Sequence, residues 1–139
     1  MNEHDAGRSQ SPGPDPEDEA RAAFETLVAG AIAAIPEPFA GQLASVAFVV
    51  EDEPLPGQAP AGGTLFGLYQ GVPRTAWGAD SATHAARITI YRRPHERWHR
   101  DPAARVRAVE ATVRHEVAHH LGISDERLRE LDSDRRRGP

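Results

Sequence analysis

The sequence predicts an α+β fold, and three observations lead to this prediction. Apolar residues recur with helical spacing in two long segments, at about residues 16–35 and 102–121. Three short segments between them are rich in β-branched and aromatic residues, which favour strands. Strands grouped between helices in this way favour a small sheet with helices packed against it. We therefore expect three to four strands packed on an N-terminal helix and a second long helix, with a further helix at the C-terminus.

The first helix is predicted to begin at Pro16, with Asp15 as its N-cap. A side-chain oxygen at the N-cap and a proline in the first turn both suit a helix start, and Pro36 is expected to stop the helix. Residues 1–14 are polar and rich in Gly, Pro and acids, so we expect a disordered acidic tail before one domain at 15–136. The expected buried stripe of the helix is Ala20, Phe24, Leu27, Val28, Ala31, Ile32 and Ile35.

Strands are expected at residues 45–51, 64–70 and 86–92. The first (SVAFVVE) is almost entirely apolar, which predicts burial on both faces. The second (TLFGLYQ) contains Gly67, and a glycine inside a strand indicates a bulge or the close approach of another backbone. The third (ARITIYR) alternates isoleucine with other residue types, which is typical of a half-buried strand.

The second long helix is predicted to follow the N-cap Asp101 and the first-turn Pro102, and to run to Leu121. Gly122 is expected to end it, because glycine adopts the left-handed conformation that helix C-termini favour. Ser124 is then placed to cap a last helix. The expected buried stripe of the long helix is Val106, Val109, Val113, Val117 and Leu121.

The composition excludes several kinds of protein and site. The chain has 139 residues, a formal net charge of -5 at pH 7 and no Cys. Disulfides and thiolate ligands are therefore excluded, and any metal has to be held by nitrogen and oxygen atoms. The acidic balance argues against a general nucleic-acid coat protein. No apolar run approaches the roughly 20 residues of a membrane span and no signal-peptide pattern is visible, so we expect a cytoplasmic protein.

The most specific feature of the chain is the segment HEVAHHLGISD at residues 115–125. His115 and His119 are four residues apart on the predicted helix, so their imidazoles project side by side and can bind one cation. Both lie on the side of the helix away from its apolar stripe. Gly122 allows a sharp turn, after which Asp125 can fold back as a third ligand. Two nitrogens and one carboxylate oxygen suit Zn²⁺, and Fe(II), Mn(II) or Co(II) would tolerate the same set.

Glu116 lies about 100° around the helix from the first histidine. It can reach a water molecule next to the metal without binding the metal, which is the logic of H-E-x-x-H sites. We therefore expect one catalytic zinc ion, Glu116 as the general base, and hydrolysis of a peptide or protein substrate. The segment at residues 64–70 is the expected edge strand, which would hold an extended substrate by backbone hydrogen bonds.

The motif resembles the signature of metzincin-type zinc peptidases, H-E-x-x-H-x-x-G-x-x-[HD]. Together with GLYQGVP and RITIYRRP, the segment HEVAHHLGISDERL is similar to a family of small bacterial zincin-like proteins described as zinc metallopeptidases. The resemblance covers about residues 17–134. It implies a minimal zincin-like fold with a mixed sheet on the motif helix, with His115, His119 and Asp125 as ligands and Glu116 as general base. The metzincin Met-turn has no counterpart, because the only Met is Met1.

Several residues near the motif also have a plain structural interpretation. His120 is interpreted as a neighbour of the ligands or a surface residue, because it points away from their side of the helix. His84, His95 and His99 are expected to be solvated in or near loops. Tyr69 and Tyr91 are expected to serve packing, with stabilisation of an oxyanion as the alternative.

Seven arginines between residues 87 and 107, close to Tyr91 and Trp98, could form an RNA-binding surface. We favour a solvated face that pairs with the many acids, and no nucleic-acid partner. The arginines still motivate a rival function, a metal-dependent endoribonuclease-like hydrolase. The bacterial endoribonucleases of rRNA maturation have H-x-x-x-H-x-x-x-x-x-H at the same spacing, but they lack the acid that Glu116 provides here. A third hypothesis is a non-catalytic, metal-stabilised interaction domain.

Overall fold

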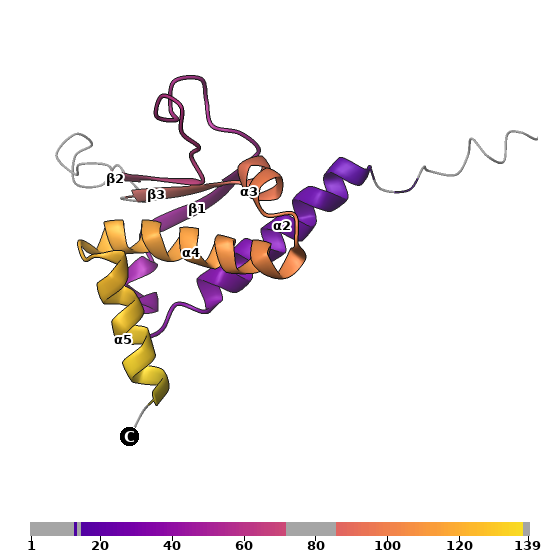
Figure 1. The fold of residues 1–139 in the computed structure, drawn as a ribbon. Coiled ribbons are helices and arrows are strands. Elements are labelled where there is room, and N and C mark those ends of the chain that lie inside the picture. Colours follow the sequence, from indigo (N-terminus) through magenta and orange to yellow (C-terminus); the bar gives the residue numbers. More distant parts are fainter. Residues whose placement is uncertain (1–12, 14, 72–85, 138–139) are drawn as a thin grey trace, which may run out of the picture.

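The computed structural model describes residues 13, 15–71 and 86–137, with side chains as far as Leu131. Figure 1 shows a small sheet with α4 running along one of its faces, α2 packed beside α4, and α5 turning away at the end of α4. The predicted α+β class is confirmed. Within the described part the elements are α2 (Pro16–Ala33), the short 3-10 helix η1 (Ala40–Leu43), β1 (Val46–Glu51), β2 (Gly67–Gly71), β3 (Ala86–Tyr91), α3 (Arg92–Trp98), α4 (Pro102–Leu121) and α5 (Asp125–Arg137).

The three strands form a mixed sheet in the order β1-β3-β2. β1 runs parallel to β3, whereas β2 runs antiparallel to it and forms one edge. The register aligns Phe48, Ile88 and Tyr69 across the sheet, and these side chains belong to or pack on the hydrophobic core. The sheet thus has one face toward the helices (Figure 1) and one face away from them, and the second face carries Arg87 and Thr89.

Three expectations about the strands were wrong in detail. β3, expected to be half-buried, is buried at every position except Arg87. In β1 only Val46 is buried and the strand ends at an exposed Glu51, because the helices cover one face of the sheet and not both. β2 begins at Gly67 rather than at residue 64. Phe66 still touches the sheet, since its carbonyl oxygen accepts a hydrogen bond of 3.0 Å from the amide of Tyr91.

The long helices begin where the sequence predicts. Asp15 Oδ1 accepts a hydrogen bond of 2.9 Å from the amide of Glu17, and Asp101 Oδ2 accepts one of 2.9 Å from the amide of Ala104. The predicted stripes pack together under the sheet, except that Val106 is 37% exposed. The core shared by α2, α4 and β3 consists of Phe24, Val28, Ala31, Val109, Val113, Val117, Ile88 and Ile90.

Helix α3 was not predicted, because residue 92 was assigned to the end of a strand and the following residues to a loop. Arg92 opens this helix and is 1% exposed, so its expected place on a solvated face was wrong. Its guanidinium binds Glu17 (Nη2–Oε1 2.6 Å), Asp52 (Nε–Oδ1 2.9 Å) and Glu96 (Nη1–Oε1 3.0 Å). The buried cation therefore joins α2, the end of β1 and α3. Hydrogen bonds from Arg21 and Arg92 lower the pKa of Asp52 to about 2.

The turn after α4 is the one predicted. Gly122 has a φ of 74°, a left-handed conformation that glycine adopts without a steric penalty. Ser124 Oγ then accepts a hydrogen bond of 2.9 Å from the amide of Arg127 and caps α5, whose Leu128 is buried against the core. Among the described helices, none has the length and apolar character needed to cross a membrane.

Candidate active site

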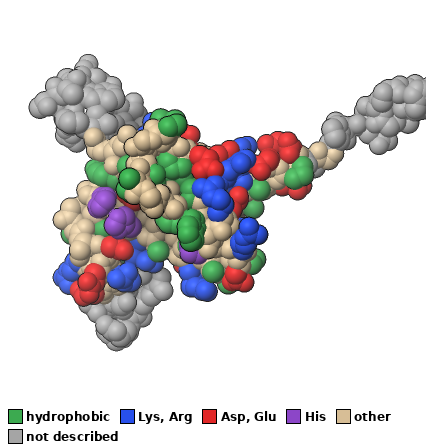
Figure 2. Space-filling model, turned by 45° about the horizontal axis from the view of Figure 1, so that its top comes forward, with side chains coloured by type: hydrophobic (Ala, Val, Ile, Leu, Met, Phe, Trp, Pro, Cys, Tyr) green, Lys and Arg blue, Asp and Glu red, His purple; other side chains and the backbone are tan. Residues whose placement is uncertain are grey.

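His115 and His119 lie side by side on the surface of α4. Their ring centroids are 4.6 Å apart, and their side chains are 52% and 55% exposed. Val113 and Val117, on the opposite side of the helix, are completely buried. Figure 2 shows histidine side chains exposed on one face of the molecule, with an acidic side chain close by. The predicted orientation, histidines outward and valines inward, is therefore present.

Glu116 is the buried member of the motif, with 5% of its surface exposed. β2 passes directly over it: a Cβ added at Gly67 would lie 3.2 Å from Glu116 Cγ and 2.7 Å from Thr112 Cγ2. Gly67 was expected to mark a bulge or the close approach of another backbone, and the groups that approach it are instead side chains of α4. Only a residue without a side chain allows the strand to lie this close to α4.

The carboxylate of Glu116 interacts with His115, His119 and the backbone of Tyr69. Its Oε1 lies 3.4 Å from His119 Nδ1, and the carboxylate also accepts a hydrogen bond from the backbone N–H of Tyr69. Burial raises the pKa of Glu116, while His115, His119 and the Tyr69 amide act in the opposite direction. These contacts hold the Glu116 side chain in one place. It lies beside the two histidines, but it is buried whereas they are exposed.

Asp125 begins α5, directly after the Gly122 turn. Its Oδ2 lies 4.0 Å from His115 Nδ1 and 3.8 Å from Arg129 Nη1. Its Oδ1 is buried and has no hydrogen-bond partner in the part of the chain that the structure describes. A buried carboxylate oxygen without a partner is costly, which makes Oδ1 a natural ligand atom for a cation.

The donor set fits a zinc ion in its chemistry. As their side chains lie, the described histidines and acids do not converge in a group of three or more around one point. However, His115 and His119 direct Nδ1 toward carboxylates, and among the described residues neither Nε2 has a partner. A neutral imidazole nitrogen without a hydrogen-bond partner is available to bind a metal ion. Two imidazole nitrogens and a carboxylate oxygen complete a set that zinc accepts.

His95 is not solvated, contrary to expectation. It lies in α3 and is completely buried between the rings of Phe24 and Phe66, and burial lowers its pKa. Its Nδ1 contacts the carbonyl oxygen of Tyr91 at 2.7 Å, and its Nε2 contacts Thr112 Oγ1 at 2.9 Å. His95 thus connects α3 to Thr112 of α4, one helical turn before Glu116. Pro94 in the first turn of α3 is the sequence signal that could have indicated this helix.

Tyr69 and His120 form a pair that the sequence analysis did not foresee. Tyr69 Oη lies 3.2 Å from His120 Nδ1, and the Tyr69 ring also contacts the ring of His119 at a centroid distance of 6.3 Å. Tyr91, by contrast, faces away from the motif and donates its hydroxyl to Gln58. His84 lies outside the described residues.

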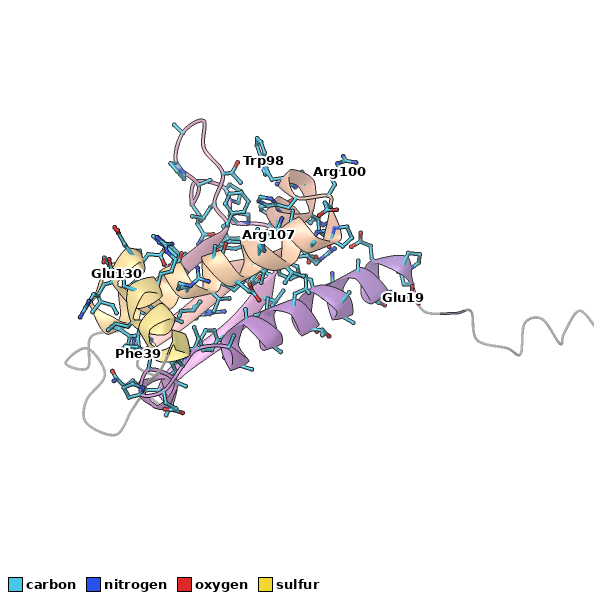
Figure 3. All side chains as sticks on the ribbon, turned by 60° about the horizontal axis from the view of Figure 1, so that its bottom comes forward. Glu19, Phe39, Trp98, Arg100, Arg107 and Glu130 are labelled. Atoms are coloured by element: carbon cyan, nitrogen blue, oxygen red, sulfur yellow. The ribbon has the colours of Figure 1, made fainter. Side chains whose placement is uncertain are left out.

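The arginines of the 87–107 segment mostly pair with acids, as the plain interpretation predicts. Besides buried Arg92, Arg93 binds Glu17 at 3.1 Å and Arg97 binds Glu53 at 2.7 Å. Figure 3 shows Trp98 and Arg100 pointing away from the body of the molecule at the α3–α4 connection. The first part of the 87–107 segment is therefore a network of ion pairs, and the α3–α4 connection that follows it is exposed.

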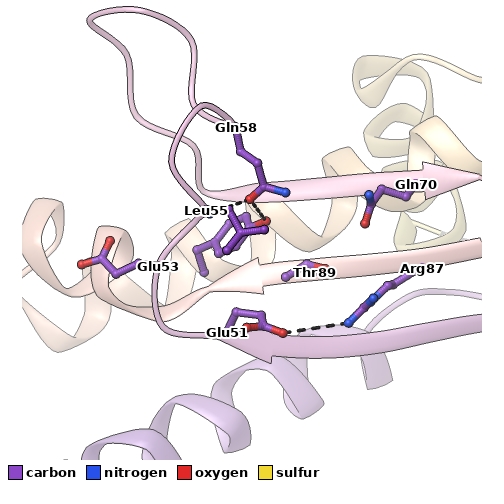
Figure 4. Close-up of a pocket in the computed structure, with 8 residues that line it drawn as sticks. Glu51, Glu53, Leu55, Gln58, Gln70, Arg87 and Thr89 are labelled. Atoms are coloured by element: carbon purple, nitrogen blue, oxygen red, sulfur yellow. Dashed lines mark hydrogen bonds and ion pairs between the residues drawn. The ribbon is translucent and has the colours of Figure 1, made fainter.

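Two cavities lie away from the motif. One of about 330 Å³, on the sheet face that the helices leave uncovered, is lined by Thr89, Tyr91, Gln58 and Arg87 among others (Figure 4). The other, of about 250 Å³, lies between α2 and α4 next to Phe24. Neither of these two cavities is lined by the motif residues.

Comparison with known proteins supports the relation suggested by the motif. A family model described as zincin-like metallopeptidase matches residues 43–135, which is more than half of the chain. No curated protein matches the chain significantly. The matched region begins after α2 and includes all three strands and the complete motif.

Proposed function

The chain belongs to the zincin-like metallopeptidase family, and from this premise we propose that it is a zinc-dependent peptidase. We assign His115, His119 and Asp125 to the metal and Glu116 to the general base. This assignment extends the family relation to individual residues through their positions in the structure.

The observation that carries the proposal is the setting of Glu116. A carboxylate that is 5% exposed is held by the Tyr69 amide and lies 3.4 Å from a histidine whose other nitrogen has no partner among the described residues. Burying a carboxylate costs free energy, and here the burial also requires a glycine in the strand above it. A glutamate with a purely structural role would not need this arrangement. A general base, in contrast, has to be held in one orientation.

Each residue of the motif has a defined task in this proposal. Zinc, when bound, supplies a Lewis acid that polarises the scissile carbonyl and makes water a stronger nucleophile at neutral pH. His115, His119 and Asp125 hold the ion. Glu116 accepts the proton of the attacking water and returns it to the leaving nitrogen. The burial of Glu116, which favours its neutral form, suits a group that has to carry and release a proton.

The substrate we propose is an extended peptide or protein segment. β2 is an edge strand of the three-stranded sheet, and it lies directly over the helix that carries the motif. An exposed strand edge can bind an extended peptide through main-chain hydrogen bonds. The Tyr69 N–H is already used by Glu116, so the remaining groups of β2 would have to hold the substrate.

The test combines metal analysis with hydrolysis. Purified protein is analysed for bound divalent metal without chelators and is then incubated with a peptide library, in parallel with Glu116→Gln. We expect about one zinc per chain in both proteins and cleavage only by the wild type. Glu110→Gln, at a half-buried position of the same helix outside the motif, is the matched control and is expected to cleave like the wild type. Absence of metal from the wild type would contradict the ligand assignment.

The rival functions have weaker support from the structure. An RNA-processing activity would need arginines that are free to bind phosphate, yet Arg92, Arg93 and Arg97 are paired with carboxylates. A non-catalytic interaction domain would not need a buried Glu116. In that case Glu116→Gln would leave the function of the protein unchanged.

A further inference from the structure

A polar stripe runs along α4 under β2. Thr112, Glu116 and His120 follow one another at intervals of four residues and therefore lie on the same side of the helix. β2 contacts all three members: Gly67 lies over Thr112 and Glu116, and Tyr69 contacts Glu116 by its amide and His120 by its hydroxyl. His120 is thus the third member of the stripe that contains the proposed general base.

The Tyr69 side chain is held in place by its surroundings. A Cβ added at Gly71 would lie 3.0 Å from Tyr69 Oη, so the glycine leaves room for the phenol. The ring contacts His119 and His120 at centroid distances of 6.3 and 5.7 Å. Its hydroxyl has one partner among the described residues, His120 Nδ1 at 3.2 Å. The pair therefore has a fixed geometry next to a proposed zinc ligand.

The hydrogen bond determines which nitrogen of His120 carries the proton. In a neutral imidazole one nitrogen donates and the other accepts, and the partner of one nitrogen sets the state of the other. Among the described residues Nδ1 is the only partner of the phenol, so we assign the phenol as the donor to Nδ1 and the ring proton to Nε2. His120 is half-buried, and Nε2 has no partner among the described residues. The result is an N–H donor beside His119 that no described group uses.

We propose that His120 is a substrate-contacting residue, whose Nε2–H donates a hydrogen bond to the carbonyl oxygen of the peptide that is cleaved. Tyr69 is its positioning residue. This inference rests on the proposed function, because it gives His120 a role in that same site. Donors directed at an oxygen that gains negative charge during hydrolysis lower the barrier of the reaction. His120 shares the buried side of the helix with Glu116, which places the donor and the general base on the same strand-covered stripe.

The test measures ligand binding separately from hydrolysis. Zinc-loaded wild type, His120→Gln and Tyr69→Phe are titrated with an alanine-based phosphinic peptide, whose PO₂⁻ group mimics the oxygens of the transition state. Zinc affinity is measured in parallel by competition with a chelator. His99→Gln and Tyr91→Phe are the matched controls, because both residues lie away from the motif. The ¹⁵N shifts of the His120 ring report its tautomer directly.

We expect His120→Gln to weaken phosphinic peptide binding by about tenfold or more, with zinc affinity unchanged. Tyr69→Phe is expected to weaken binding less and to give a mixture of His120 tautomers, while both controls behave like the wild type. The proposal is overturned if His120→Gln binds the phosphinic peptide as the wild type does, if its zinc affinity falls in parallel, or if zinc or the phosphinic peptide does not bind the wild type.

Hydrolysis is scored independently with the peptide library. A wild type that binds zinc and the phosphinic peptide but cleaves nothing would contradict the proposed function, and the His120 comparison would still decide this inference. Conversely, equal cleavage of peptides by the wild type and by His120→Gln would contradict the inference alone.

Discussion

The backbone N–H of Tyr69 donates a hydrogen bond to the carboxylate of Glu116, although the two residues belong to different elements far apart in the chain. Strand β2 and helix α4 therefore meet at the acid of the motif. The same strand covers that acid at Gly67 and contacts His120 through the phenol of Tyr69. A short edge strand thus organises the polar stripe of the motif helix.

Replacing Gly67 by alanine is expected to damage both the fold and the site. The new Cβ would lie 2.7 Å from Thr112 Cγ2 and 3.2 Å from Glu116 Cγ, so β2 and α4 would have to move apart. We expect a loss of about 1–3 kcal/mol in the free energy of unfolding, measured by urea denaturation, and strongly reduced hydrolysis. Gly30→Ala is the control, because its Cβ meets nothing within 4 Å and helix propensity predicts a gain of about 1 kcal/mol. Equal stability of the two variants would contradict the close approach.

The buried guanidinium of Arg92 is expected to be a major source of stability. Arg92→Met keeps much of the apolar volume but leaves the carboxylates of Glu17, Asp52 and Glu96 without their shared cation. We expect a loss of about 2–3 kcal/mol in the free energy of unfolding, because the hydrogen bonds of the charged guanidinium are lost and three partly exposed carboxylates are left close together. Arg97→Met breaks the exposed pair with Glu53 and is expected to cost less than about 1 kcal/mol. Thermal unfolding of the two variants side by side distinguishes these outcomes.

Stability is expected to fall in acid partly because Asp52 titrates. Its pKa in the folded protein is about 2, below the ordinary value of 3.8, so the unfolded chain binds its proton first as the pH falls. The contribution is complete above about pH 5, declines as the pH drops below the ordinary pKa, and is lost below about pH 2. Asp52→Asn should unfold with a shallower dependence on pH between 2 and 5, as measured by denaturation at several pH values. An unchanged slope would show that Asp52 is not the group responsible.

Zinc binding is expected to stabilise the wild type and to depend on the three assigned ligands. At a free zinc concentration of about 100 times Kd, the free energy of unfolding should rise by about 2.7 kcal/mol, and a chelator should reverse the gain. His119→Ala and Asp125→Asn should each weaken zinc affinity by more than the roughly 10- to 100-fold typical of losing an outer hydrogen-bond partner. His99→Ala serves as the control for general effects of removing a histidine. Zinc affinity that survives Asp125→Asn would remove this residue from the ligand set.

The features that the sequence predicts well depend on neighbours in the chain. The N-caps Asp15 and Asp101, the turn at Gly122 and the cap at Ser124 all involve groups within four residues of each other. The outward orientation of His115 and His119 follows from the helical repeat. Local rules are sufficient for these features, and they already define the motif.

The features that the sequence did not predict are contacts between distant segments. The buried Arg92 is paired with acids from α2 and from the end of β1. The buried His95 contacts the hydroxyl of Thr112 in α4. The pairing of Tyr69 with His120 requires the register of β2 over α4. None of these partners can be recognised from spacing, because each depends on how the elements pack.

The Gly122 turn places all three proposed zinc ligands within one helix–turn–helix unit, whereas the groups that hold Glu116 and His120 come from β2. In this proposal the residues that bind the metal are close together in the sequence. The residues needed for catalysis come from segments that are far apart in the sequence. An isolated peptide spanning residues 101–131 would carry the complete ligand set and lack the strand that orients the acid. If the proposed function holds, the chain would acquire its metal before the rest of the domain has assembled, and would become a hydrolase only when the sheet docks on the helix.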